Sequence, residues 1–334
     1  MLLRMQRNGP QALPKGFMLG VNYPWHHYGQ DFGTNSWGHT GVSDPAARQS
    51  VDADFAYLEK QGVTRIRWFL FCDGRAGIRY AIDGSVIGLD DFVFPDMDAA
   101  IELAARHHIQ IVFVFFDFHL LKTREVVGGV QVGGRSTLIA DAKLQRTLVE
   151  NAIVPVLKRY AHEKQIIAWE VINEPEWSMQ LGPFSSAAIN FLHRMHAVRT
   201  MDEVPAPIMV DFVKRVAALV HADTQQWVTL GSAGGKYLSM WKNCSLDFLE
   251  VHYYGSLMPW FVQPAQSFNS NVPILVGEFP SSNKLPLFLD DFLMNGYSGA
   301  FIWSLNATDR YSNFRGLAPR WHKWQTQHEK QLAR

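Results

Sequence analysis

Eight short apolar runs alternate with amphipathic segments along this sequence, and this alternation restricts the fold more than any other feature. The runs are almost continuous in hydrophobic residues, as is typical of strands buried on both faces of a parallel sheet. Eight such strands, each followed by a helix, close into a (β/α)8 barrel. We therefore expect a single (β/α)8 TIM barrel of the α/β class, with strands at residues 18–23, 65–71, 110–116, 166–172, 227–230, 248–253, 274–276 and 300–303.

Helical patterns fill the intervals between the predicted strands. The first has Asp44 as a candidate N-cap, Pro45 in its first turn and Gly62 just past its end. Pro155 lies inside a longer segment and predicts a kink or an irregular turn there, because proline lacks the N–H that the helix needs. The expected helices cover residues 44–61, 96–107, 141–162, 207–221, 283–295 and 319–332.

A doubly wound open sheet is the main rival fold, and it usually has a glycine-rich phosphate loop after its first strand. Here the first predicted strand runs into Tyr23-Pro24-Trp25, which offers no glycine cradle. No internal repeat or low-complexity linker divides the chain. We expect one catalytic domain over residues 1–334, in which residues 1–16 form an N-terminal extension.

Three of the predicted connections are longer than a barrel requires. They span residues 25–43, 121–140 and 175–206, and they follow the first, third and fourth strands. Barrel active sites are built at the C-terminal ends of the strands, where these connections begin. We expect these extended loops to form the walls of a cleft.

Composition excludes several classes of partner. The 334 residues carry a formal net charge of zero, so neither a nucleic acid nor an anionic membrane is an expected partner. No run approaches the ~18 apolar residues of a membrane span. The N-terminus lacks the apolar stretch of a signal peptide, so we expect a cytoplasmic protein, or a secreted one if a leader has been removed. Cys72 and Cys244 have no metal-type spacing and are either free thiols or one disulfide.

The residues that point to chemistry are two glutamates, each at the end of an apolar run. Glu174 follows Ile172-Asn173, and Glu278 follows Val276-Gly277. A carboxylate at a strand end is held firmly and still faces the solvent. Two such groups brought together by the fold can cleave a glycosidic bond with no metal or cofactor.

Other polar and aromatic residues gather at the same ends of the predicted strands. Buried strand ends seldom hold so many ionisable groups without a purpose, because each one must be paired or hydrogen-bonded. We interpret Glu170 and Glu250 as structural, with Glu170 paired to a strand arginine. The candidate site residues, besides Glu174 and Glu278, are Arg67, His119, Asn173, His252, Tyr254 and Trp303.

This pattern resembles the clan A retaining glycoside hydrolases, and within that clan it is most similar to the cellulase-type family 5. The motif Asn173-Glu174-Pro175 after the fourth strand and Glu278 at the end of the seventh carry the resemblance. The remaining matches are Arg67, His119, His252-x-Tyr254 and Trp303, in register with the other strands. The resemblance implies a retaining β-glycoside hydrolase acting on β-1,4-linked glucose or mannose polymers or their oligosaccharides.

The same resemblance implies a role for each matched residue. Glu174 would be the acid/base and would need a raised pKa, whereas Glu278 would be the nucleophile and would need a lowered one. Arg67 would lower the pKa of Glu278, and Tyr254 would orient that carboxylate. Asn173 would bind the sugar 2-hydroxyl.

The resemblance leaves two roles open for the histidines and assigns the tryptophans to the sugar. His119 and His252 would bind sugar hydroxyls or adjust Glu174. Trp303 would form the floor of the subsite that holds the attacked sugar. Trp25 and Trp177 are our preferred further platforms, and Tyr28, Trp37 and Trp260 are open between platform and loop packing.

Two other functions stay open. A non-hydrolytic carbohydrate-binding barrel would keep the aromatic platforms but has no need of both carboxylates. A metal-dependent barrel hydrolase would use strand-end residues such as His119, His252 and Asp117. The sequence has no His-Glu-x-x-His motif and no His-x-His after its first strand, so we expect no metal and no cofactor.

Overall fold

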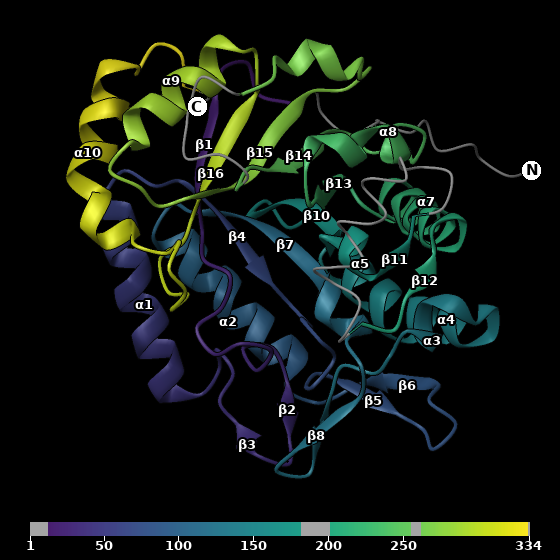
Figure 1. The fold of residues 1–334 in the computed structure, drawn as a ribbon. Helices are drawn as coiled ribbons and strands as arrows, with labels where there is room; N and C mark the ends of the chain where they lie inside the picture. The colour runs from purple at the N-terminus through teal and green to yellow at the C-terminus, as the bar shows by residue number, and fades with distance from the viewer. Residues whose placement is uncertain (1–12, 182–200, 255–261, 333–334) are drawn as a thin grey trace, which may run out of the picture.

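The computed structural model describes residues 13–181, 201–254 and 262–332. Eight parallel strands form a closed barrel in the order β1-β16-β15-β14-β13-β10-β7-β4 (Figure 1), as the sequence predicts. These strands are β1 (Met18–Asn22), β4 (Arg65–Phe69), β7 (Gln110–Asp117), β10 (Ile166–Asn173), β13 (Trp227–Ser232), β14 (Leu249–His252), β15 (Ile274–Pro280) and β16 (Gly299–Trp303). All eight predicted strands are therefore confirmed.

The barrel is stabilised because each strand packs apolar side chains both against the surrounding helices and into the barrel interior. Every residue of β1, β4, β14, β15 and β16 is buried, and these strands contribute to the main core beneath the surrounding helices. A smaller cluster that includes Val112, Leu275 and Phe301 fills part of the barrel interior. Because both faces are packed, the strands read as apolar runs in the sequence.

The helices lie outside the strands, and their ends follow the predicted signals in most places. The described helices are α1 (Pro45–Lys60), α2 (Val93–Arg106), α3 (Thr137–Ala140), α4 (Ala142–Leu148), α5 (Val154–Arg159), α7 (Ala206–Asp223), α8 (Leu238–Trp241), α9 (Leu285–Met294) and α10 (Phe314–Gln327). Asp44 caps α1 by accepting from the N–H groups of Ala46 and Ala47. Gly62, just after α1, has φ +72°, a conformation that favours glycine.

The segment predicted as one helix over residues 141–162 is divided by a π-helical turn at Val149–Ile153, immediately before Pro155. This confirms the irregularity expected at the proline, since a π turn accommodates a residue that cannot donate to the ordinary helical acceptor. The last helix begins earlier than predicted, at Phe314, because Asn313 caps it by accepting from Gly316.

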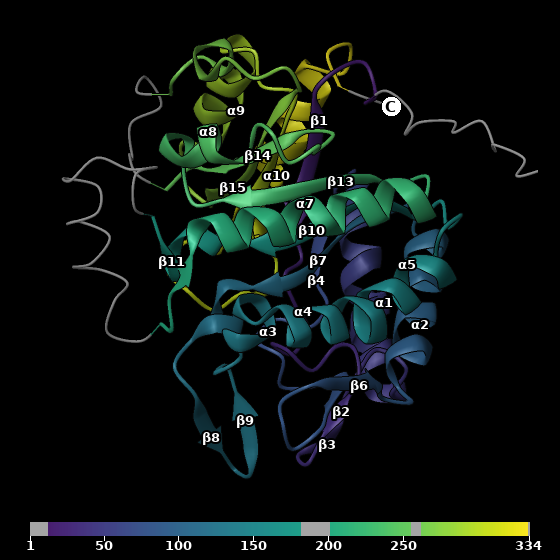
Figure 2. The same ribbon diagram turned by 90° about the vertical axis from the view of Figure 1, so that its right-hand side faces the viewer.

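Short hairpins extend the loops beyond the barrel. The loop after β1 carries β2 (Thr34–Asn35) and β3 (Gly38–His39), and the loop after β7 carries β8 (Glu125–Val127) and β9 (Val130–Val132). A further hairpin, β5 (Ile78–Tyr80) and β6 (Val86–Leu89), follows β4 and was not predicted. Figures 1 and 2 show the three hairpins projecting on one side of the barrel.

The remaining elements are short. Four turns of helix follow strand or loop ends at η1 (Phe118–Leu121), η3 (Pro175–Ser178), η5 (Gly235–Tyr237) and η7 (Ala265–Phe268). The strands β11 (Met179–Gln180) and β12 (Val204–Pro205) pair in parallel after η3. Both cysteines are buried free thiols. No helix among the described residues is both long and apolar enough to cross a bilayer.

Candidate active site

Glu174 and Glu278 lie together at the C-terminal end of the barrel. One carboxylate oxygen of each residue and one ring nitrogen of His252 all lie within 4.8 Å of one another. The two side chains are only 15% and 6% exposed. Retaining glycosidases place their carboxyl groups ~5–5.5 Å apart, whereas inverting enzymes place them ~6.5–9.5 Å apart. The separation in this barrel fits the retaining arrangement.

Each oxygen of Glu278 has a donor of its own. Nη1 of Arg67 lies 2.7 Å from Oε1, and the hydroxyl of Tyr254 donates to Oε2 over 2.8 Å. Tyr254 follows β14, which pairs with the strand of Glu278, whereas Arg67 reaches the carboxylate from β4 on another side of the barrel, so the carboxylate is held from two directions. Both contacts agree with the positions predicted for these residues.

The pKa of Glu278 is raised, not lowered as the resemblance led us to expect. Burial is the largest cause, and it outweighs the nearby His252 and Arg67, which act in the opposite direction. Arg67 therefore acts with the expected sign but does not dominate. The sequence places the cation correctly but contains no measure of how deeply the carboxylate is enclosed.

Both oxygens of Glu174 are also occupied. Nδ1 of His252 lies 2.7 Å from Oε1, and the indole N–H of Trp177 donates to Oε2 over 2.8 Å. Burial raises the pKa of Glu174 to about 7, although the bond from Trp177 lowers it. A raised pKa is what the resemblance implies for this carboxyl group.

The backbone at Glu174 is held in an uncommon conformation. Its φ of +45° and ψ of +46° are left-handed, which is costly for a residue with a side chain. Its N–H donates to the carbonyl of Gly231 on β13 over 2.7 Å, and Pro175 begins η3 directly after it. Because of this turn, the backbone at Glu174 no longer follows the direction of the preceding strand β10.

Arg67 organises the base of the site. It is fully buried and forms a bidentate pair with Glu170, over 2.5 Å and 2.7 Å. It also donates to the side-chain oxygens of Asn22 and Asn173, over 3.0 Å and 2.8 Å. The prediction that Glu170 pairs with a strand arginine is confirmed. Because Arg67 takes the Asn173 oxygen, the Asn173 amide nitrogen is directed elsewhere and is available as a donor.

Glu250 is the third carboxyl group beside Arg67, at 3.8 Å from its Nε. Burial and the charge of Glu170 raise the pKa of Glu250 to about 8. The group is therefore largely protonated at neutral pH, which lowers the negative charge concentrated around Arg67.

The two candidate histidines differ in exposure. His252 is completely buried against Glu174, so of the two roles left open for it the structure favours contact with that carboxyl group. The His119 side chain is 40% exposed, and its Nδ1 lies 3.2 Å from Asp117. Burial lowers the pKa of His119, but the charge and hydrogen bond of Asp117 together with the charge of Asp73 outweigh it, and the pKa is raised. His119 therefore remains able to face a bound sugar.

The candidate platforms Trp25, Trp177 and Trp303 lie at or just after the C-terminal ends of barrel strands. Trp303 is 9% exposed, and its indole N–H donates to Asp309 over 2.7 Å. Trp25 is half-buried and packs edge-on against Trp303, with ring centroids 5.9 Å apart. Trp177, expected as a platform, also contacts Glu174 directly, a role that was not predicted. Trp260, another possible platform, lies outside the described residues.

Sequence reasoning missed two further residues near the site. Asn22 on β1 donates to the carbonyl of Gly277 over 2.9 Å and accepts from Arg67, so it links β1 to the strand of Glu278. Glu176 in η3 is fully buried and accepts from Ser232 and Trp241, which anchors the turn after Glu174. The sequence signal that could have identified Asn22 is a polar amide within the apolar run at residues 18–23.

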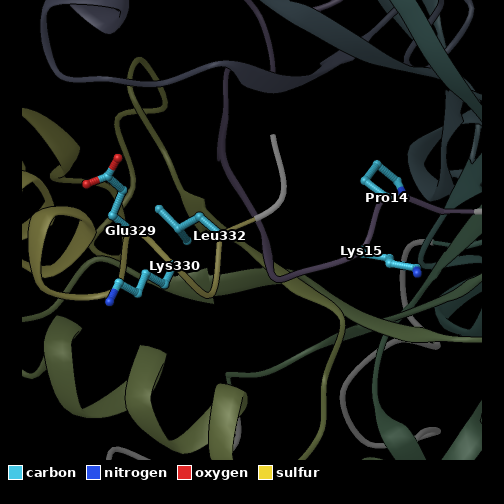
Figure 3. Close-up of a pocket in the computed structure, with 5 residues that line it drawn as sticks. All are labelled: Pro14, Lys15, Glu329, Lys330 and Leu332. Carbon is cyan, nitrogen blue, oxygen red and sulfur yellow. The ribbon is translucent and has the colours of Figure 1, made fainter.

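A separate hollow of about 470 Å³ lies near the chain ends, away from the glutamates. Figure 3 shows its lining, which comprises Pro14, Lys15, Glu329, Lys330 and Leu332. Pro14 and Lys15 precede β1, so this hollow is at the end of the barrel opposite the strand C-termini. It has no part in the arrangement around Glu174 and Glu278.

The closed barrel with two facing glutamates at its C-terminal end defines a class: the protein is a retaining β-glycoside hydrolase. Sequence relatives agree with this class, although no family model matches the chain. The chain is 23% identical over 338 residues to a mannan endo-1,4-beta-mannosidase of Mytilus edulis, covering 90% of this chain and 87% of the relative. It is 24% identical over 341 residues to the enzyme of the same name from Cryptopygus antarcticus, covering 90% and 84%.

Solved structures share the fold. The endo-1,4-beta-mannanase from Eisenia fetida superposes with a TM-score of 0.74 at 21% identity, covering 94% of this chain and 93% of that one. A family 5 mannosidase from Rhizomucor miehei gives a TM-score of 0.58 at 11% identity, covering 95% of both chains. The resemblance inferred from the motifs therefore fits these findings: the relatives by sequence are mannan endo-1,4-beta-mannosidases, and a family 5 mannosidase shares the fold.

Proposed function

We propose that this protein is an endo-acting β-1,4-mannan hydrolase in which Glu278 is the nucleophile and Glu174 is the acid/base. The observation that carries the proposal is that one carboxylate oxygen of Glu174 lies within 4.8 Å of one carboxylate oxygen of Glu278. Mannan is preferred over glucan as the substrate because both sequence relatives named above are mannan endo-1,4-beta-mannosidases.

In the first step, an oxygen of Glu278 attacks the anomeric carbon and the bond to the leaving sugar breaks. Glu174 gives its proton to the leaving oxygen. The contacts around Glu278 support the role of nucleophile, because Arg67 and Tyr254 both favour its ionised form and fix its direction. A pKa of about 7 leaves much of Glu174 protonated at neutral pH, as the role of acid requires.

In the second step, water attacks the same carbon and the bond to Glu278 breaks. Glu174, now ionised, takes a proton from the water, which restores both carboxyl groups to their starting states. The amide nitrogen of Asn173 is placed to donate to the sugar 2-hydroxyl, since Arg67 holds the amide oxygen. Trp303 would lie beneath the attacked sugar.

The experiment is hydrolysis of mannan, β-1,4-glucan and xylan by the full chain, with the product sizes measured by chromatography. We expect mannan to be cleaved fastest and to give oligosaccharides of mixed length at early times. Monosaccharide alone at early times would contradict endo action, and faster cleavage of glucan would contradict the choice of substrate. Proton NMR of the fresh products should show the β-anomer first, and an α-anomer first would contradict retention.

A non-hydrolytic carbohydrate-binding barrel is the alternative. It predicts oligosaccharide binding without turnover on any of these polysaccharides. All four carboxylate oxygens of Glu174 and Glu278 have hydrogen-bond partners in the protein. This favours hydrolysis, because a protein that only binds sugars has no need of two oriented and buried acids.

A further inference from the structure

A row of planar side chains leads away from the glutamates toward the projecting hairpins. The row consists of Trp25, Tyr28, Arg75 and Trp37, and we call it the outer row. Its inner end is Trp25, whose ring centroid lies 5.9 Å from that of Trp303. The rings of Trp25 and Tyr28 are 4.8 Å apart.

Arg75 connects the inner and outer parts of this row. Its guanidinium carbon lies 4.7 Å from the centroid of Tyr28 and 5.8 Å from that of Trp37. Asp73 holds the guanidinium through Nε and Nη2, at 2.9 Å and 2.7 Å. The structure gives Nη1 no partner among the described residues, so it is placed as a free donor beside two aromatic rings.

Trp37 is the exposed end of the row. It lies in the turn between β2 and β3, and 38% of it is exposed. Its indole N–H is already used, because it lies 3.2 Å from the carbonyl oxygens of both Val127 and Gly128 in the β8–β9 hairpin. The polar edge of the ring is therefore turned inward, and what remains in contact with water is apolar ring surface.

Contacts from two hairpins fix the position of Trp37. Asn35 accepts from the backbone N–H of Trp37 over 2.8 Å and donates to the carbonyl of Arg75 over 3.3 Å. Gly128 has φ +52°, and a Cβ there would lie 2.8 Å from Nε1 of Trp37. Two hairpins from different loops thus hold one exposed indole in a fixed orientation, which is costly in entropy unless the ring has a use.

We propose that Trp37 forms an outer glycan subsite that holds a distant sugar of the same chain that Glu174 and Glu278 cleave. The occupant follows from continuity, since the outer row begins at the floor of the proposed active site and lies on loops from the same ends of the strands. Sugar rings present apolar C–H faces to an indole and hydroxyls to a guanidinium donor, which is the chemistry that the row offers. This inference rests on the proposed function.

The test is calorimetric binding of mannobiose through mannohexaose to the full chain carrying Glu278→Ala, which keeps substrates intact. The affinity should increase with chain length. Adding Trp37→Ala should weaken the affinity for the longer oligosaccharides by about 3- to 10-fold, which corresponds to the loss of one aromatic contact. Leu287→Ala is the matched control, because Leu287 is an exposed apolar residue on α9, and it should leave the series unchanged.

Trp37→Phe separates ring stacking from support of the hairpin. It keeps an aromatic face but loses the N–H that holds Val127 and Gly128, so it should retain part of the gain with chain length. An unchanged series in Trp37→Ala would overturn the inference, as would equal weakening of all lengths, which would make Trp37 a general structural support.

Two further outcomes are informative. A change in oligomeric state on Trp37→Ala, seen by sedimentation with no change in the binding series, would assign the exposed ring to a protein contact and overturn the proposal. If the Glu278→Ala protein binds no manno-oligosaccharide at any length, the proposed function fails and the outer subsite fails with it. If the Glu278→Ala protein binds manno-oligosaccharides and Trp37→Ala does not weaken that binding, the outer subsite is refuted and the proposed function stands.

Discussion

Nδ1 of His252 lies 2.7 Å from Oε1 of Glu174, and the histidine ring is completely buried. Burial lowers the pKa of His252 to about 4, so the ring is neutral near pH 7. A neutral imidazole can accept from a protonated carboxyl group or donate to an ionised one, depending on which nitrogen carries its proton. The contact can therefore persist while Glu174 loses and regains its proton.

Activity should fall as the pH rises through about 7, because the acid form of Glu174 is lost there. Trp177→Phe removes a hydrogen bond that favours the ionised form of Glu174. The pKa of Glu174 should then rise further, and the alkaline limb of the kcat/KM profile should move up by about 0.5–1 pH unit. A limb that stays in place would show that another group controls it.

The nucleophile can be identified by chemical rescue. Glu278→Ala should reduce turnover of an aryl β-glycoside by several orders of magnitude, and azide should partly restore it as the α-glycosyl azide, because azide attacks directly in the emptied space. Glu174→Ala should instead slow deglycosylation and give the β-glycosyl azide. NMR of the products distinguishes the two anomers, and wild-type rates from Glu278→Ala would refute the assignment.

The sequence predicts the strands and both glutamates because these depend on local pattern. Each strand is buried on both faces and appears as an apolar run, and Glu174 and Glu278 stand at the ends of such runs. The ordering of strands around a barrel then places both acids at one end without any knowledge of individual contacts.

Other features depend on distant contacts and could not be read in this way. Asp96 suggests the start of a helix, but α2 begins at Val93, and Asp96 is buried where it accepts from Gly33 and Ser43 of the loop after β1. The direction of the pKa shift of Glu278 depends on the balance of burial against Arg67. Neither depends on residues adjacent in the chain.

One glycine, Gly231, should be as important as the titrating residues. A Cβ on Gly231 would lie 2.5 Å from Oε1 of Glu170 and 2.9 Å from Nε2 of His252. Gly231→Ala should therefore displace Glu170 and His252 at the base of the site and lower kcat/KM by at least about fivefold, if the cost of overpacking, about 1–3 kcal/mol, falls on the active geometry. Gly234→Ala is the matched control, because nothing lies within 4 Å of its Cβ position. Equal activity of the two variants would contradict this packing argument.

Metal dependence can be tested directly. Glu174, His252 and Glu278 are close enough to hold a cation, and the metal-dependent hydrolase is thus a specific alternative. However, all four carboxylate oxygens already have protein partners, which a cation would have to displace. We expect full activity after dialysis against EDTA. Activity that is lost with EDTA and restored by a divalent metal would overturn the two-carboxylate mechanism.

Arg67 should be the residue whose loss costs the fold most. Arg67→Met leaves Glu170 and Glu278 buried without their cation, which should lower the free energy of unfolding by about 3–5 kcal/mol. Arg106→Met, which removes an exposed pair with Asp52, should cost at most about 1 kcal/mol.

The loss at Arg67 should also depend on pH in a defined direction. Without the cation, the folded-state pKa of Glu278 lies further above its unfolded value, so folding is disfavoured more as the pH rises and this group must ionise. Urea unfolding of Arg67→Met should therefore show a larger deficit at pH 8 than at pH 5, whereas the Arg106→Met deficit should change little. An equal deficit at both pH values would mean that Arg67 stabilises the barrel by packing rather than by compensating these charges.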